Sequence, residues 1–193
     1  MKDVVGDSVE DVEIGLRSII RDTYKKYEYL YQYPEEKSKV SSSYLSDFER
    51  FKNFKENKYN VNPKEAKKEL KDSIHFLSEL LHKYHGQRVY VLVDEYDKPV
   101  NYLLEDYLGQ EKTPEKDKLI KDIARLISAT ICVSKDNPYL QKLIFTGIFD
   151  TAYKEFGSGC NNIKVYGISS AKFSKSFGFS EGEVKQLVTH LQF

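Results

Sequence analysis

The stretch that decides the fold is RVYVLVDEYDKPV, residues 88–100. Four apolar residues and one tyrosine, residues 89–93, lead directly into three carboxylates: Asp94, Glu95 and Asp97. A short β-branched run of this kind is typical of a strand that helices cover on both faces of a parallel sheet. The carboxylates that follow either form a ligand site or are the ordinary polar end of a strand leaving the core. This stretch alone leaves both interpretations open.

Two further strands are predicted downstream. They are KLIFTG, residues 142–147, and IKVYGI, residues 163–168. Residues 117–134 carry apolar side chains at helical spacing, so strand, helix and strand follow one another and predict a right-handed parallel crossover. The polar residues 105–118, which include a glycine and a proline, are predicted to form a surface loop. We therefore expect the first two strands to lie side by side and to end at the same edge of the sheet.

Amphipathic helices are predicted before and after these strands. The pairs Ser8/Asp11 and Ser180/Glu183 each have the spacing of a capping box, which marks a helix start. An Asn-Pro pair marks another start, and a glycine marks its end. The predicted helices run from Ser8 to before Pro34, over residues 41–54, from Asn62 to Gly86, and from Ser180 onward.

The composition is that of a globular chain. With 193 residues, 40% of them apolar and 13% aromatic, the sequence suits one domain with a true core. Its 30 basic and 30 acidic residues cancel, so no overall field favours nucleic acid or an anionic membrane. Cys132 and Cys160 lack metal-ligand spacing, and neither a signal peptide nor a membrane-spanning stretch is visible. These features predict a cytoplasmic protein with two ordinary thiols.

The carboxylates after the first strand suit magnesium chemistry. In open parallel sheets, ligands bind beyond the carboxyl ends of the strands. Asp94 at such an end can hold Mg²⁺ on a nucleotide phosphate, and Glu95 beside it can orient and deprotonate a water molecule. This is the pattern of a Walker B strand. A PD-(D/E)xK nuclease motif does not fit, because Tyr96 stands two residues before Lys98, where that motif has an acidic residue.

Five motifs together carry a family resemblance. In chain order they are LVDEYDKP, KDNPYL, FTGI, SG-NN-KVY and FGFS-xx-EV. The sequence from about Asp72 to Val188 resembles the bacterial AAA-ATPase-like family, in which a P-loop ATPase domain is often followed by a PD-(D/E)xK nuclease domain. The N-terminal helices resemble the variable helical insert of that family.

The resemblance implies a fold. It is an α/β fold of the P-loop NTPase type (AAA, ASCE class), with a parallel sheet flanked by helices and a helical N-terminal insert. Residues 1–193 would form a single partial domain. Residues 1–86 would be its helical segment, and residues 87–193 would hold the Walker B and sensor strands with their flanking helices.

The resemblance also implies a site and its ligands. Asp94 would be the magnesium residue and Glu95 the catalytic residue. Thr146 and Gly147 would occupy the sensor position near the γ-phosphate, and the cofactors would be ATP and Mg²⁺. One position departs from the family: Asp150 stands where a basic residue is usual shortly after TGI, and its charge would repel phosphate.

The larger departure is the phosphate-binding loop. A P-loop needs GxxxxGK[ST], and none of the ten glycines in this sequence precedes a lysine. In the family this motif lies upstream of the helical insert. We therefore expect an internal fragment, inactive alone, whose sheet has a gap that the upstream Walker A segment or another protein chain fills. The alternative is a non-enzymatic remnant or a protein-interaction module. Nucleic-acid binding is supported only by the family's nuclease partner, since this sequence has no basic patch.

Overall fold

The computed structural model describes residues 1–31, 41–60, 62–132, 137–148, 163–167, 170–173 and 178–191. The chain divides into two compact units, Met1–Cys160 and Asn161–Phe193. The assignment of one domain to the whole chain stays a prediction.

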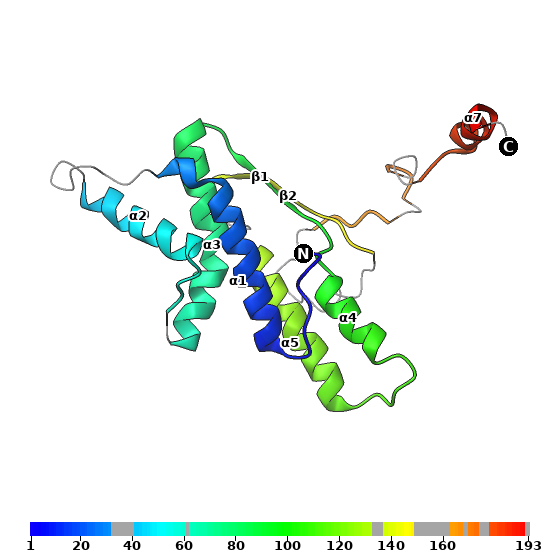
Figure 1. Cartoon of the computed structure of the whole chain (residues 1–193), viewed down its shortest axis with the longest axis horizontal. Helices are drawn as coiled ribbons and strands as arrows, with labels where there is room; N and C mark the ends of the chain where they lie inside the picture. The colour runs from blue at the N-terminus through cyan, green and yellow to red at the C-terminus, as the bar shows by residue number, and fades with distance from the viewer. Residues whose placement is uncertain are drawn as a thin grey trace. The chain divides into compact units, whose positions relative to one another are not determined.

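Helices make up most of the first unit (Figure 1). Its elements are α1 (Val9–Lys26), η1 (Glu28–Leu30), α2 (Ser42–Lys55), α3 (Pro63–His85), β1 (Val89–Val93), α4 (Lys98–Asp106), α5 (Pro114–Ile131) and β2 (Leu140–Phe145). The second unit contains α7 (Glu181–Leu191).

Side-chain caps fix the helix starts that the sequence predicts. The hydroxyl of Ser8 accepts the backbone N–H of Asp11 at 3.1 Å, and the side chain of Asn62 accepts that of Lys64 at 3.0 Å. The chain leaves α3 at Gly86, whose φ of 68° is a left-handed conformation that favours glycine. The predicted helix boundaries at these positions are confirmed.

The core lies between α1, α2, α3 and α5. The Tyr24 ring on α1 is fully buried, with its centroid 5.1 Å from that of Phe51 and 4.9 Å from that of Phe54. Its hydroxyl donates to the Ser73 carbonyl on α3 at 2.7 Å, so the one polar atom of this ring is satisfied. Other buried members of this core include Leu16, Leu70, Phe76, Ile123 and Ile127.

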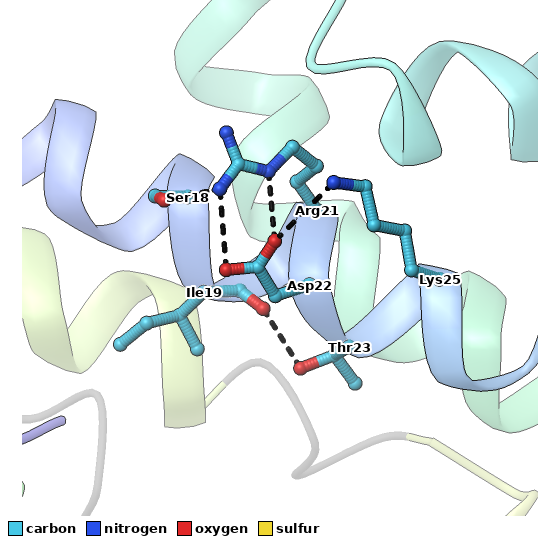
Figure 2. A network of polar contacts seen from close by, with 6 residues as sticks. All are labelled: Ser18, Ile19, Arg21, Asp22, Thr23 and Lys25. Atoms are coloured by element: carbon cyan, nitrogen blue, oxygen red, sulfur yellow. Dashed lines mark hydrogen bonds and ion pairs between the residues drawn. The ribbon is translucent and has the colours of Figure 1, made fainter.

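The outer face of α1 carries an ionic network (Figure 2). Arg21 Nε donates to Asp22 Oδ1 at 2.8 Å, and Lys25 Nζ lies 3.7 Å from the same oxygen. The hydrogen bond from Arg21 lowers the pKa of the Asp22 carboxyl below its ordinary value. These groups are open to solvent, where ion pairs stabilise a fold very little. We conclude that the packing of the other face holds α1 in place.

The two strands pair in parallel, as predicted. Val91 lies opposite Leu143 and Val93 opposite Phe145. β1 has the predicted bounds, whereas β2 begins and ends two residues before the predicted strand 142–147. Thr146 and Gly147 therefore lie in the loop just beyond the strand.

Two local predictions are wrong. A helix, α4, occupies residues that we did not assign to one, and the loop between α4 and α5 is correspondingly shorter than predicted. Residues 163–167 form no strand in the part of the chain that the structure describes, and residue 168 lies outside it. Strand geometry is stabilised by a paired neighbour, and Val165 in this segment is instead 56% exposed.

One face of the sheet is open within the first unit. Tyr90 and Leu92 on β1 and Ile144 on β2 are 58%, 72% and 42% exposed. The side chains of the opposite face, Val91 and Leu143 among them, are half-buried. The expectation that helices cover both faces therefore holds for one face of the described strands only.

Cys132 does not carry the free thiol that we expected, because it is disulfide-bonded. Cys160 lies outside the described residues. Disulfides are rare in cytosolic proteins, so the cysteines no longer support a cytoplasmic location. Across the described residues, no helix combines the length and apolar character that a membrane crossing requires.

Candidate functional site

The carboxyl ends of β1 and β2 meet at one edge of the sheet, around Thr146. The backbone N–H of Thr146 donates to the Val93 carbonyl at 2.9 Å, and its carbonyl accepts the N–H of Tyr96 at 3.2 Å. Thr146 thus bonds to the residues on either side of Asp94 and Glu95. These two residues form a tight loop that projects beyond the strand end.

Asp94 is exposed and makes its side-chain contacts through one oxygen. Its Oδ1 accepts hydrogen bonds from the Thr146 hydroxyl and, at 3.0 Å, from the backbone N–H of Glu95. The bond from Thr146, followed by that from Glu95, lowers the pKa of the Asp94 carboxyl. Oδ2 accepts no hydrogen bond from the described residues. Asp94 is therefore a carboxylate at neutral pH, with one oxygen available to a ligand.

The backbone at this loop carries a second polar contact. The amino group of Met1 donates to the Asp94 carbonyl, and the positive charge of that amino group also lowers the pKa of the Asp94 carboxyl. The effect is smaller than that of the hydrogen bonds to Oδ1. Both the side chain and the main chain of Asp94 thus attract positive or donor groups.

Glu95 has a left-handed backbone, with φ of 50°. A non-glycine residue in this region is uncommon, and such conformations cluster at ligand-binding and active sites. The Glu95 carbonyl accepts the N–H of Lys98 at 3.1 Å, which closes the turn into α4. Along a regular strand, successive side chains alternate between faces. The turn at Glu95 breaks this alternation between the two neighbouring carboxylates.

Gly147 lies where the two loops touch. A Cβ atom at this position would lie 2.6 Å from Cε1 of Tyr96 and 2.7 Å from Oδ1 of Asp97. Both distances are shorter than real contacts allow, so a side chain at residue 147 would push the loops apart. Glycine at residue 147 allows the loop after β2 to pack closely against Tyr96 and Asp97. This packing role is distinct from the predicted position near the γ-phosphate, which stays a prediction.

Sequence reasoning missed Asp97 as part of this edge. Its side chain is 1% exposed, and its Oδ2 accepts the backbone N–H of Ile148 at 2.8 Å and the Asn101 amide at 2.9 Å. The signal in the sequence was that Asp97 is the third carboxylate within four residues after β1, which is more than a solvated strand end requires. The sequence could not show that its partner follows the second strand.

The structure brings the predicted site residues together. Asp94 and Thr146 touch, Glu95 follows Asp94, and Gly147 packs on the residues after Glu95. Asp150, which departs from the family pattern, lies outside the described residues. The predicted juxtaposition of Asp94 and Thr146 at one edge is confirmed.

The donor set fits Mg²⁺ bound together with a phosphate. Mg²⁺ typically takes one or two carboxylates and completes its shell with water and phosphate oxygens. Asp94, ionised and with Oδ2 available, can be that carboxylate. Within the described ranges, no three His, Cys, Asp or Glu side chains gather into a group that could hold a metal ion by themselves. Water and phosphate oxygens would complete the shell of a cation that Asp94 holds.

The sequence matches the model of one known protein family. The sequence model of the AAA-ATPase-like family, described as a predicted AAA-ATPase, matches residues 2–156. The chain belongs to the AAA-ATPase-like family. Neither the curated proteins nor the solved structures that were searched gave a match.

The AAA-ATPase-like match extends over the whole candidate site. It begins before α1 and continues past β2, so the N-terminal helices belong to the matched region together with Asp94, Glu95, Thr146 and Gly147. It ends at residue 156, before the last two of the five motifs in the sequence. Membership in this family implies the use of a nucleotide with Mg²⁺.

Proposed function

We propose that this chain supplies the magnesium-binding and water-activating edge of an ATPase site. The observation that carries the proposal is the contact between the Thr146 hydroxyl and Asp94 at the shared end of two parallel strands. Asp94 is the magnesium ligand, Glu95 the catalytic base, and Thr146 with Gly147 the sensor segment facing the γ-phosphate.

The roles of the two carboxylates follow from their surroundings. Mg²⁺ held at this edge would supply neutralisation of the phosphate charge of ATP. Asp94 would hold that cation through Oδ2, because the hydrogen bonds to Oδ1 favour the ionised carboxyl and leave Oδ2 available. Glu95 accepts a proton from the attacking water through its carboxylate, a contribution that is typically about 10²- to 10⁴-fold in rate.

The phosphate-binding loop comes from a different polypeptide segment. The sequence contains no GxxxxGK[ST] motif, whose backbone N–H groups and lysine supply most of the affinity for phosphate. In the described part of the chain, β1 and β2 pair only with each other, which leaves a ladder edge on each strand for an added strand. The isolated chain is therefore expected to bind Mg-ATP weakly and to hydrolyse little of it.

A complementation experiment tests this function. The full chain is mixed with a strand–P-loop–helix segment from a family member that carries GxxxxGK[ST], and ATP hydrolysis and Mg-ATP binding are measured. Hydrolysis is expected to appear in the mixture. Glu95→Gln should then lower the rate about 10²- to 10⁴-fold while keeping nucleotide bound, and Asp94→Asn should weaken magnesium-dependent binding.

The matched control is Glu105→Gln, which changes an exposed carboxylate on α4. This variant should hydrolyse ATP at the unmodified rate. If Glu95→Gln also keeps that rate in an active mixture, the catalytic role of Glu95 is wrong. Micromolar Mg-ATP binding by the isolated chain, lost in Asp94→Asn, would contradict the need for a second segment.

The open face of the sheet favours a second function, that of a non-enzymatic protein-interaction module. Leu92 and Ile144 are apolar, lie side by side on paired strands and are exposed within their unit. Such a module would bind its partner through these residues and would not need the carboxylates. Partner binding that survives Asp94→Asn and Glu95→Gln but is lost in Leu92→Asp, with no ATP hydrolysis in any mixture, would favour this function.

A further inference from the structure

The carboxylate of Asp97 joins two segments that are distant in the sequence. Asp97 is the N-cap residue of α4, a position where aspartate usually accepts an N–H from the first turn of its own helix. Its side chain makes no such capping bond. It accepts the N–H of Ile148 instead, 51 positions along the chain, at 2.8 Å. The side chain therefore ties the loop after β2 to the start of α4.

Hydrogen bonds compensate the burial of the Asp97 side chain. A buried carboxylate is costly unless hydrogen bonds or charges compensate it, and the N-terminus of a helix favours a negative charge. Asn101, itself 4% exposed, donates its side-chain amide to Asp97 at 2.9 Å. Its own Oδ1 is buried and has no hydrogen-bond partner among the described residues. The orientation of Asn101 thus satisfies Asp97 and leaves its own oxygen unsatisfied.

The loop held in this way carries the sensor residue. Ile148 follows Gly147, which packs against the Tyr96 ring and Asp97 without room for a side chain. Gly147 in turn follows Thr146, whose backbone bonds to the end of β1 and whose hydroxyl meets Asp94. The β1 end and Asp97 therefore hold the loop 146–148 on its two sides.

We propose that Asp97 is a positioning residue, which holds the loop 146–148 so that the Thr146 hydroxyl meets Asp94. The inference rests on the proposed function in one respect: the contact between Thr146 and Asp94 affects activity only if Asp94 is the magnesium ligand. The contact itself can be measured without metal or nucleotide. A complementation mixture that shows neither Mg-ATP binding nor ATP hydrolysis would contradict the proposed function and leave this inference standing.

The test uses NMR of the full chain without added ligands. Three-bond couplings report the χ1 rotamer of Thr146, and amide hydrogen exchange reports the bond from Ile148. The variants are Asp97→Ala and Asp97→Asn, and the asparagine keeps one acceptor oxygen and nearly the same volume. The control is Asp106→Ala, which removes an exposed carboxylate from the same helix.

Asp97→Ala should release Thr146 from its single rotamer and speed exchange at Ile148. The expected increase is about 10- to 100-fold, because a hydrogen bond to a charged acceptor is lost. The amides within β1 should keep their protection, Asp97→Asn should show a smaller increase, and Asp106→Ala should show none. Should Asp97→Ala fail to fold, Asp97→Asn provides the test, through exchange at Ile148 compared with exchange within β1.

Two results would overturn the inference. In the first, Thr146 keeps a single rotamer although the Ile148 bond is lost. In the second, exchange rises equally at Ile148 and within β1. The second pattern would show that Asp97 stabilises the fold as a whole and has no selective effect on the loop that carries Thr146.

Discussion

The helical core and the two-stranded sheet are built from similar apolar side chains but differ in what covers them. Leu70 on α3 and Ile127 on α5 are fully buried, whereas Leu92 on β1 is 72% exposed and Ile144 on β2 is 42% exposed. Burial of apolar surface is what stabilises a fold. The helices therefore provide most of the stability of the first unit, and the candidate site lies at the end of strands that bury less apolar surface.

This difference gives the polar contacts at the sheet edge a particular importance. The loops after β1 and β2 are held by backbone bonds through Thr146 and by the carboxylate of Asp97. Few apolar contacts from the open face add to them. Substitutions in the core should therefore lower global stability, while those at the edge should mainly change the geometry of the site.

The largest expected effect comes from the core. Leu70→Ala should lower the free energy of unfolding by about 2–5 kcal/mol, because the lost methyl groups leave a cavity in a fully buried position. Leu92→Ala on the open face should change it by less than about 0.5 kcal/mol. Chemical denaturation of the two variants measures the difference. Equal losses would mean that Leu92 is covered in solution.

A smaller effect is expected where the two loops touch. Gly147→Ala should lower the free energy of unfolding by about 1–3 kcal/mol, because the new Cβ overlaps Tyr96 and Asp97. Denaturation and amide exchange near Thr146 measure it. The control is Gly182→Ala on α7, which meets open space and should not destabilise the protein. Unchanged stability and exchange in Gly147→Ala would show that the loops are farther apart than described.

The buried hydroxyl of Tyr24 should have a modest effect. Tyr24→Phe removes the hydrogen bond to the Ser73 carbonyl and should cost about 0.5–1.5 kcal/mol of unfolding free energy. Thermal unfolding compares it with Tyr84→Phe, which changes an exposed ring on α3 and should have no effect. A stability equal to that of the unmodified protein would mean that the Ser73 carbonyl finds another donor.

The smallest effect is expected on the outer face of α1. The lowered pKa of Asp22 in the folded state means that its contribution to stability is present above its unfolded pKa near 3.8 and is lost as pH falls through the folded value. Asp22→Asn should lower the melting temperature slightly at pH 7. It should have no effect once the pH is low enough to protonate the carboxyl in the folded as well as in the unfolded protein.

Salt provides a check on this last prediction. Because the Asp22 network is open to solvent, added salt should screen its charges and remove the difference at pH 7. Asp106→Asn, which changes an exposed carboxylate on α4, serves as the control. A difference that persists at that low pH or in high salt would show that Asp22 acts through packing and not through its charge.

Local sequence patterns predicted the elements whose signals are local. The caps at Ser8, Asn62 and Ser180 lie within three residues of the amides or carboxylates that they contact, so spacing alone revealed them. The β-branched run before Asp94 likewise marked β1. The parallel pairing followed from the order of strand, helix and strand, and this order predicted that Asp94 lies near Thr146.

Features that depend on distant partners could not be predicted. The strand expected from residue 163 to residue 168 has suitable residues but needs a neighbour, and composition does not supply one. The bond between Asp97 and Ile148 joins segments that touch only after the sheet has formed. The left-handed backbone of Glu95 has no signal in its residue type, since glutamate rarely adopts it.

Two non-glycine residues with positive φ, Asn57 and Glu95, differ in what a stabilising substitution would cost. Asn57 and Glu95 have φ of 58° and 50°, and replacing such residues with glycine is a common way to relieve backbone strain. Asparagine tolerates this conformation well, so little would be gained at residue 57. At residue 95 glycine would relax the backbone and remove the carboxylate together. A variant selected for thermal resistance alone would be drawn to this substitution, and the gain in robustness would be accompanied by loss of the proposed catalytic base.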